Sequence, residues 1–201
     1  EDIKPLLVGK DPRQIKQNFQ IMTKHGFWKL GVIGMSAISG IEHALWDILG
    51  KSLNTPVWQL LGGKVRDKVK IYTHLGMGDM KAVYRDTMNV SGLTDHAQKL
   101  VDLGYTAFKV VFIPFTHYTV LKEDLSLVNT LMSSLRDKVG DNIKIMVDIH
   151  GRCASGISAI QYTKELEAYN PMFIEEPIQP GDTSTLLQIK ESINCPLATG
   201  E

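Results

Sequence analysis

The stretch that decides the fold is residues 145–201, where three short apolar runs each end in a carboxylate. The runs are IMVD (145–148), MFIE (172–175) and CPLATGE (195–201), and their acids are Asp148, Glu175 and Glu201. Successive acids are about 26–27 residues apart, roughly the length of one strand–loop–helix–loop unit of a parallel sheet. Three carboxylates at the ends of adjacent barrel strands would converge on one point, where a hard divalent cation can neutralise them.

Outward from this stretch, the chain alternates between strand-like and helix-like patterns from about residue 67, which is typical of a parallel sheet with crossover helices. The expected strands are 69–72, 106–112, 143–148, 172–175 and 196–200, and the expected helices are 93–103, 125–139, 154–167 and 183–193. A closed (β/α)8 TIM barrel needs eight strands. We therefore expect an α/β chain, truncated after about five strands of such a barrel, and an internal fragment of a longer protein.

Residues 1–66 have helical patterns instead. Asp11 and Pro12 suggest a helix start, and residues 36–49 carry apolar side chains on one helical face before Gly50. The change of period predicts two domains, residues 1–66 and residues 67–201.

The composition excludes several classes of protein. The 22 Lys and Arg residues balance the 22 Asp and Glu residues, which disfavours a nucleic-acid partner. The two cysteines exclude a disulfide framework and suit a cytoplasmic location. We expect that no run approaches the roughly 18 apolar residues of a membrane span, and hence that the chain has no membrane partner.

Asp148 and His150 are two positions apart, so within a strand they would point the same way, toward the mouth of the barrel. A carboxylate that binds a metal beside an imidazole that exchanges protons is a mechanistic pair. A solvated turn is the alternative for an isolated Asp-x-His. The three aligned acids favour the metal site.

Four segments carry a resemblance to a known family. Residues 37–51, AISGIEHALWDILGK, and the later segments FIEEP (173–177) and ATGE (198–201) resemble the mandelate racemase/muconate-lactonising branch of the enolase superfamily. Residues 147–152, VDIHGR, resemble the first ligand segment of its acid-sugar dehydratases, most closely the galactonate dehydratase type. The similarity extends over nearly the whole chain.

The resemblance implies an α+β capping domain, of which residues 1–66 would be the C-terminal helical part, followed by a modified (β/α)8 barrel that binds one Mg2+. It implies that Asp148, Glu175 and Glu201 are the metal ligands, and that the motif favours Glu175 over Glu176. The shared step in this family is removal of the proton beside a carboxylate to give an enediolate. The full-length protein would be a homo-oligomer acting on a small sugar acid.

The second strand departs from the racemases, which carry Lys-x-Lys with the second Lys as base. Here the base position is Val111, which cannot take a proton. The dehydratases also lack this Lys and use a His of the seventh strand, which would lie beyond Glu201. By the same resemblance His150 is the general acid that protonates the departing β-hydroxyl, and the isolated chain should be inactive.

Weaker candidates have ordinary alternatives. Lys109, His117, Tyr118 and Arg152 are predicted to bind the substrate, although Lys109 could be a supporting charge, Arg152 could pair with a nearby acid, and the segment with His117 and Tyr118 could be an ordinary loop. His74 ends the first strand and could line the pocket.

The leading interpretation is Mg2+-dependent dehydration of an aldonate such as galactonate to a 2-keto-3-deoxy acid, that is, a hydro-lyase. The alternatives are another acid-sugar dehydratase or racemase of the superfamily, or a truncated, non-catalytic relative with a structural or binding role. The strand-end acids do not define the stereochemistry of the sugar.

Overall fold

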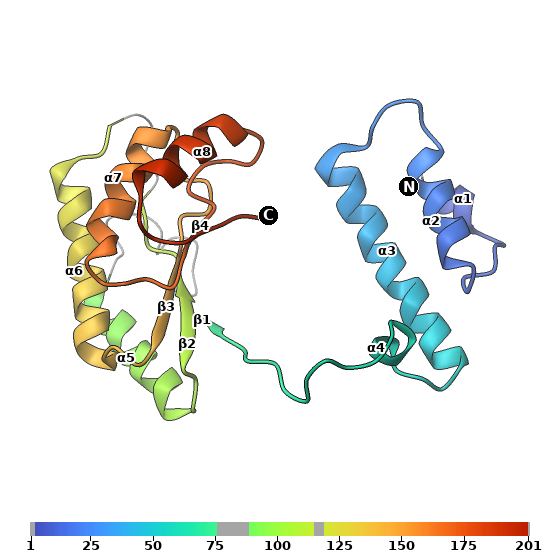
Figure 1. The fold of residues 1–201 in the computed structure, drawn as a ribbon, viewed down its shortest axis with the longest axis horizontal. Helices are drawn as coiled ribbons and strands as arrows, with labels where there is room; N and C mark the ends of the chain where they lie inside the picture. Colours follow the sequence, from blue (N-terminus) through green and yellow to red (C-terminus); the bar gives the residue numbers. More distant parts are fainter. Residues whose placement is uncertain (1–2, 76–88, 115–118, 201) are drawn as a thin grey trace. The chain divides into compact units, whose positions relative to one another are not determined.

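The computed structural model describes residues 3–75, 89–114 and 119–200. Contacts divide the chain into two compact units, Glu1–Val69 and Lys70–Glu201. The first unit contains α1 (Lys4–Leu7), α2 (Ile15–Lys24), α3 (Gly31–Ser52) and α4 (Val57–Leu60) (Figure 1).

Helices α2 and α3 form the core of the first unit. Ile15 and Met22 of α2 are buried together with Ile38 and Leu45 of α3. In each helix the two residues are seven positions apart, which is two helical turns, so they lie on one face. The apolar periodicity therefore selects the faces that pack.

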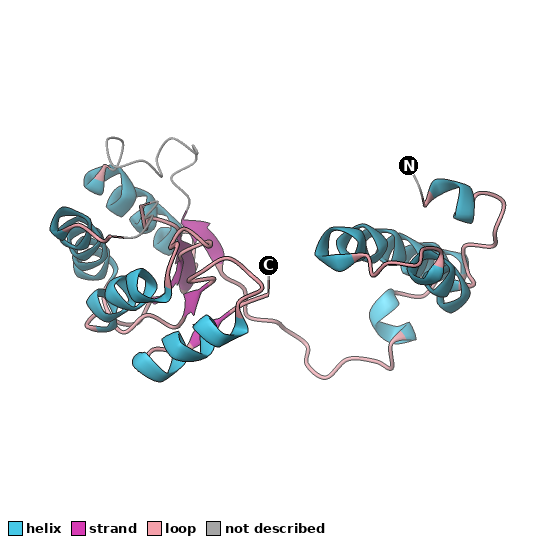
Figure 2. Ribbon diagram, turned by 90° about the horizontal axis from the view of Figure 1, so that it is seen from above, coloured by secondary structure: helices cyan, strands magenta, loops and turns pink. Residues whose placement is uncertain are grey.

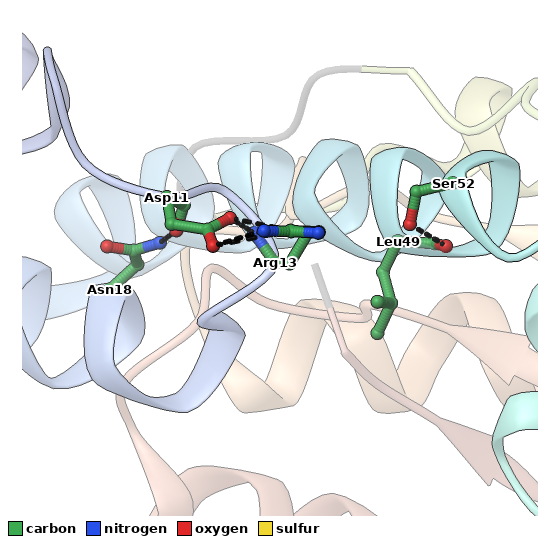
Figure 3. A network of polar contacts seen from close by, with 5 residues as sticks. All are labelled: Asp11, Arg13, Asn18, Leu49 and Ser52. Carbon is green, nitrogen blue, oxygen red and sulfur yellow. Dashed lines mark hydrogen bonds and ion pairs between the residues drawn. The ribbon is translucent and has the colours of Figure 1, made fainter.

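The start of α2 differs from the expectation that Asp11 and Pro12 begin it. The helix begins at Ile15, because Asp11 is used in the preceding turn (Figure 3). The Asp11 carboxylate accepts from the backbone N–H and the guanidinium of Arg13 at 2.9 Å, and its backbone carbonyl accepts from Asn18 Nδ2 at 2.9 Å. At the end of α3, Ser52 Oγ donates to the Leu49 carbonyl at 2.8 Å (Figure 3).

Helix α3 is long and apolar enough, by length and composition, to cross a membrane. The expectation that no run of the chain reaches this length is therefore wrong for this helix. The core helix of a soluble protein passes the same test when it is mostly buried, whereas only 11% of this window is buried, although Ile38 and Leu45 of α3 lie in the core of the first unit. One such helix is a weak indication of a membrane span.

The second unit is an alternation of strands and helices, as expected. Its strands are β1 (Thr73–Leu75), β2 (Ala107–Val110), β3 (Lys144–Asp148), β4 (Ile174–Glu175) and β5 (Leu197–Ala198), and its described helices are α5 (Val90–Asp102), α6 (Lys122–Val139), α7 (Gly156–Glu167) and α8 (Thr183–Ser192). The strands form one parallel sheet in the order β1-β2-β3-β4-β5. The α/β class and the five-stranded parallel piece are confirmed.

The first strand lies later than predicted. The sequence favoured residues 69–72, whereas β1 begins at Thr73, which pairs with Phe108 of β2. Residues 69–72 have the composition of a strand, but the position of the hydrogen-bonding partner decides which residues form the ladder.

The helices cover one face of the sheet, as Figure 2 shows. That face is apolar: Phe108, Val110, Ile145 and Val147 are fully buried in one core with residues of α5, α6 and α7. Because side chains alternate along a strand, Lys109, Met146 and Asp148 lie on the opposite face. This is the face that a closed barrel turns toward its interior.

Candidate metal and acid–base site

Two of the three predicted metal ligands lie side by side at the ends of adjacent strands. Asp148 is the last residue of β3, Glu175 is the last residue of β4, and the two are direct partners in the parallel ladder. The separation of one strand–helix unit between Asp148 and Glu175 in the sequence therefore brings them to the same height in the sheet. The third predicted ligand, Glu201, lies outside the described residues.

Lys109 of β2 joins the two carboxylates. Its Nζ lies 2.7 Å from Glu175 Oε1 and 3.1 Å from Asp148 Oδ2. Lys109 pairs with Met146, two residues before Asp148, so its backbone lies about 6–7 Å below that of Asp148 at about 3.3 Å per residue. The long lysine side chain covers this distance and places its ammonium between the acids.

The cluster formed by Lys109, Asp148 and Glu175 is largely buried but is still partly accessible to water. The side chain of Lys109 is 14% exposed, that of Asp148 7% and that of Glu175 20%. Burial opposes the charge on Lys109, yet hydrogen bonds and attraction from Glu175 and Asp148 outweigh it, so the pKa of Lys109 is raised. The ammonium is therefore held in its charged form by the two acids.

One oxygen of this cluster has no partner. Among the described residues, buried Asp148 Oδ1 makes no hydrogen bond, while Oδ2 faces Lys109. A buried carboxylate oxygen without a partner is costly unless another group occupies the position next to it.

His150 lies beside the cluster, in the turn that follows β3. The expectation that Asp148 and His150 share a face by strand alternation is wrong, because β3 ends at Asp148 and His150 adopts a left-handed conformation with φ of 55°. Its Nδ1 lies 3.9 Å from Asp148 Oδ2, and its side chain is 55% exposed. The imidazole thus lies beside the carboxylate and remains open to solvent.

The residues present fit a hard divalent cation. Asp148 and Glu175 supply carboxylate oxygens, the ligands that Mg2+ and Ca2+ prefer, and the partnerless Asp148 Oδ1 offers an open position. Within the described ranges no group of three or more His, Cys, Asp or Glu side chains is arranged to hold a metal. The described part of the chain would supply two carboxylates to such a cation, with the Lys109 ammonium now lying between them.

Arg152, predicted to bind substrate, is buried and serves another contact. Its guanidinium donates to the Ile113 carbonyl at 2.8 Å and thereby links the segments that follow β2 and β3. Burial lowers the pKa of Arg152, and attraction from Asp148 opposes this shift. A substrate contact of Arg152 stays a prediction. His117 and Tyr118 lie outside the described residues.

Two further residues lie near the site: His74, which the sequence offered as a pocket residue, and Glu176, for which it carried little signal. Burial lowers the pKa of His74 of β1, with a further contribution from Lys109, so His74 lies within electrostatic range of the cluster. The sequence placed His74 at the end of the first strand, whereas it is the middle residue of β1 and pairs with Lys109. Glu176 is buried, with a side-chain oxygen accepting from the Gly200 N–H, and only its adjacency to Glu175 marked it.

A hollow of about 720 Å3 lies between the segment after β3 and the start of α8. Arg152, Cys153, Gln179 and Asp182 are among its lining residues, whereas Lys109, Asp148 and Glu175 are not. The hollow is therefore separate from the carboxylates, which face the inner side of the sheet.

Two family models match the chain. Residues 1–62 match the family model of the mandelate racemase/muconate lactonizing enzyme N-terminal domain. Residues 92–201 match the family model described as enolase C-terminal domain-like.

Solved structures are similar over the whole chain. A protein from Zymomonas mobilis ZM4, named as a dehydratase, is 32% identical with a TM-score of 0.89, and the match covers 100% of this chain and 54% of that one. An enolase from Agrobacterium radiobacter, named as a galactarate dehydratase and bound to Na and L-malate, is 31% identical with a TM-score of 0.83, covering 100% and 49%. An enolase from Pantoea ananatis with bound D-gluconate and Mg is 29% identical with a TM-score of 0.77, covering 98% and 52%.

The chain thus spans about half the length of these relatives. The two family models follow one another in the order of the two compact units. The parallel sheet, with acids at the ends of β3 and β4, belongs to the second of them. This chain belongs to the mandelate racemase/muconate lactonizing branch of the enolase superfamily.

Proposed function

We propose that this chain is part of a metal-dependent dehydratase of acid sugars, which converts an aldonate to a 2-keto-3-deoxy acid. The observation that carries the proposal is the pairing of Asp148 with Glu175 at neighbouring strand ends, on one lysine, with Asp148 Oδ1 left without a partner among the described residues. Because the chain spans about half of its relatives, the activity is proposed for the whole protein.

The ligands of two relatives support an acid as the substrate. One holds D-gluconate with Mg, and the other holds L-malate with Na. Both organic ligands are 2-hydroxy carboxylates, the chemical class that an acid-sugar dehydratase takes. Galactonate is the aldonate that the resemblance of residues 147–152 favours.

Asp148 and Glu175 would hold Mg2+, with Glu201 as the third ligand. When bound, the cation supplies positive charge that stabilises the negative charge developing as the α-proton leaves. Lys109 contributes a second positive charge on the same face of the sheet, where it can attract the carboxylate of the substrate.

His150 is assigned as the general acid. In the reaction the α-carbon loses a proton to a base, the β-carbon–oxygen bond breaks, and the hydroxyl leaves as water with a proton from the imidazole. The resulting enol becomes the 2-keto-3-deoxy acid. Histidine is the side chain that ordinarily exchanges protons near neutral pH, and the exposed His150 can reach a substrate from solvent.

The test is a panel of aldonates and aldarates with the natural full-length protein and Mg2+, read as 2-keto acid formed and as α-proton exchange in D2O. We expect at least one substrate to lose water, and the His150→Asn variant to be at least about 100-fold slower. His96→Asn, an exposed histidine on α5, is the matched control and should keep the parent rate.

A His150→Asn variant as fast as the parent would remove the acid role. Exchange of the α-proton without loss of water would instead indicate a racemase. No turnover of any acid by the parent would favour a non-catalytic relative.

A further inference from the structure

Glu176 is a buried carboxylate that the proposed chemistry does not use. Its side chain is 4% exposed, and its backbone has φ of 41°, a left-handed conformation. Left-handed backbone is uncommon for residues other than glycine, and buried carboxylates need partners. The surrounding contacts must therefore hold this residue in place.

Those contacts join three segments. The Glu176 N–H donates to the Ala198 carbonyl at 3.0 Å, and the Glu176 carbonyl accepts from the Gly151 N–H at 2.7 Å. The Glu176 side chain, through Oε1, accepts from the Gly200 N–H. The residue thus ties the end of β4 both to the turn after β3 and to the segment after β5.

Each tied segment borders a predicted site residue. Gly151 directly follows His150, which also has a left-handed backbone, so the bond from Gly151 holds the turn that presents the imidazole. Gly200 directly precedes Glu201 in the sequence. Glu175, the neighbour of Glu176 on the other side, pairs with Asp148.

We propose that Glu176 is a positioning residue, whose side-chain bond to the Gly200 N–H fixes the backbone that carries the third metal ligand. The inference rests on the proposed function for the identity of that ligand. A charged acceptor binds a backbone N–H more strongly than a neutral one, and its loss would remove this partner from the Gly200 N–H. Groups that orient a metal ligand typically contribute 10–100-fold to metal affinity.

The test compares Glu176→Ala and Glu176→Gln with Glu167→Ala in the natural full-length protein. Glu167 is the matched control, because its Oε1 also accepts from backbone N–H groups, those of Asn194 and Cys195, at the opposite end of β5. Two quantities are measured: Mg2+ affinity by calorimetry, and amide exchange of residues 197–200 without metal.

We expect Glu176→Ala to bind Mg2+ at least about 10-fold more weakly and to exchange residues 197–200 faster. Glu176→Gln keeps an acceptor oxygen and should stay within about 3-fold of the parent affinity. Glu167→Ala should lower the melting temperature, but its Mg2+ affinity should also stay within about 3-fold of that of the parent.

Unchanged exchange of residues 197–200 in Glu176→Ala would overturn the inference, and so would an equal loss of affinity in Glu167→Ala, which would indicate general loosening of β5. A parent that binds no Mg2+ while the exchange results hold would overturn the proposed function but leave the Glu176 contact standing. The two failures are thus distinguishable.

Discussion

Replacing Lys109 by methionine removes the ammonium that joins Asp148 to Glu175 and keeps a long apolar side chain in its place. In metal-free protein the two carboxylates then lie at paired strand positions with no positive charge between them. We expect Lys109→Met to destabilise the metal-free protein and Mg2+ to restore most of the loss, because the cation takes over the neutralising charge.

The magnitude follows from the two contacts of 2.7 and 3.1 Å. At an effective dielectric constant of about 20, each contact is worth about 5–6 kcal/mol of attraction, most of which offsets the cost of removing the charges from water. Breaking a buried pair typically costs about 3–5 kcal/mol, and the partial exposure of all three side chains favours the lower end, about 3 kcal/mol. For a unit of this size, the melting temperature should fall by about 6–12 °C.

The assay is thermal unfolding in EDTA and in saturating Mg2+, with Lys144→Met as the matched control. Lys144 is an exposed lysine of the adjacent strand β3, and its replacement should change stability by less than about 0.5 kcal/mol. Equal melting temperatures for Lys109→Met and Lys144→Met in EDTA would refute the reasoning that Lys109 holds the two acids.

Three further predictions concern pH, thiols and packing. Because the pKa of Lys109 is raised on folding, its contribution to the free energy of unfolding is fully present below the ordinary lysine pKa of about 10.4 and is lost as pH rises through the raised value. In urea unfolding at increasing pH, Lys109→Met should therefore lose less stability at alkaline pH than the parent. An identical alkaline decrease in both proteins would contradict this. Cys153 and Cys195 are free and buried, and burial raises their pKa to about 12 and about 11, so a thiol reagent at pH 8 should label the native protein at least about 100-fold more slowly than the unfolded chain; equal rates would show that the thiols are accessible. A Cβ at Gly156 would lie 2.8 Å from Thr185 Cγ2, so Gly156→Ala should cost about 1–3 kcal/mol of unfolding free energy, and a neutral effect would mean that α7 and α8 are not in close contact.

The elements around the site were readable in the sequence because each has a local signal. Helices α7 and α8 follow apolar runs at helical spacing. The separation of Asp148 and Glu175 by about one strand–helix unit predicted that they pair in the sheet. These features depend on periodicity, which one sequence displays directly. The family resemblance rests on the same segments.

What the sequence did not show depends on three-dimensional register or on backbone conformation. The ammonium of Lys109 meets both acids only because β2 pairs with β3 two residues below Asp148. The left-handed backbones of His150 and Glu176 have no side-chain pattern that a sequence displays. The start of β1 at Thr73 was set by its partner strand for the same reason.

The most direct test of the central claim is calorimetric titration of Mg2+ into the metal-free natural full-length protein and its Asp148→Asn variant. We expect the parent to bind one Mg2+, and the variant, which keeps the shape of the side chain but loses a carboxylate ligand, to bind at least about 100-fold more weakly. A parent that binds no Mg2+, or a variant that binds it as tightly, would contradict the assignment of Asp148 and Glu175 as a metal site.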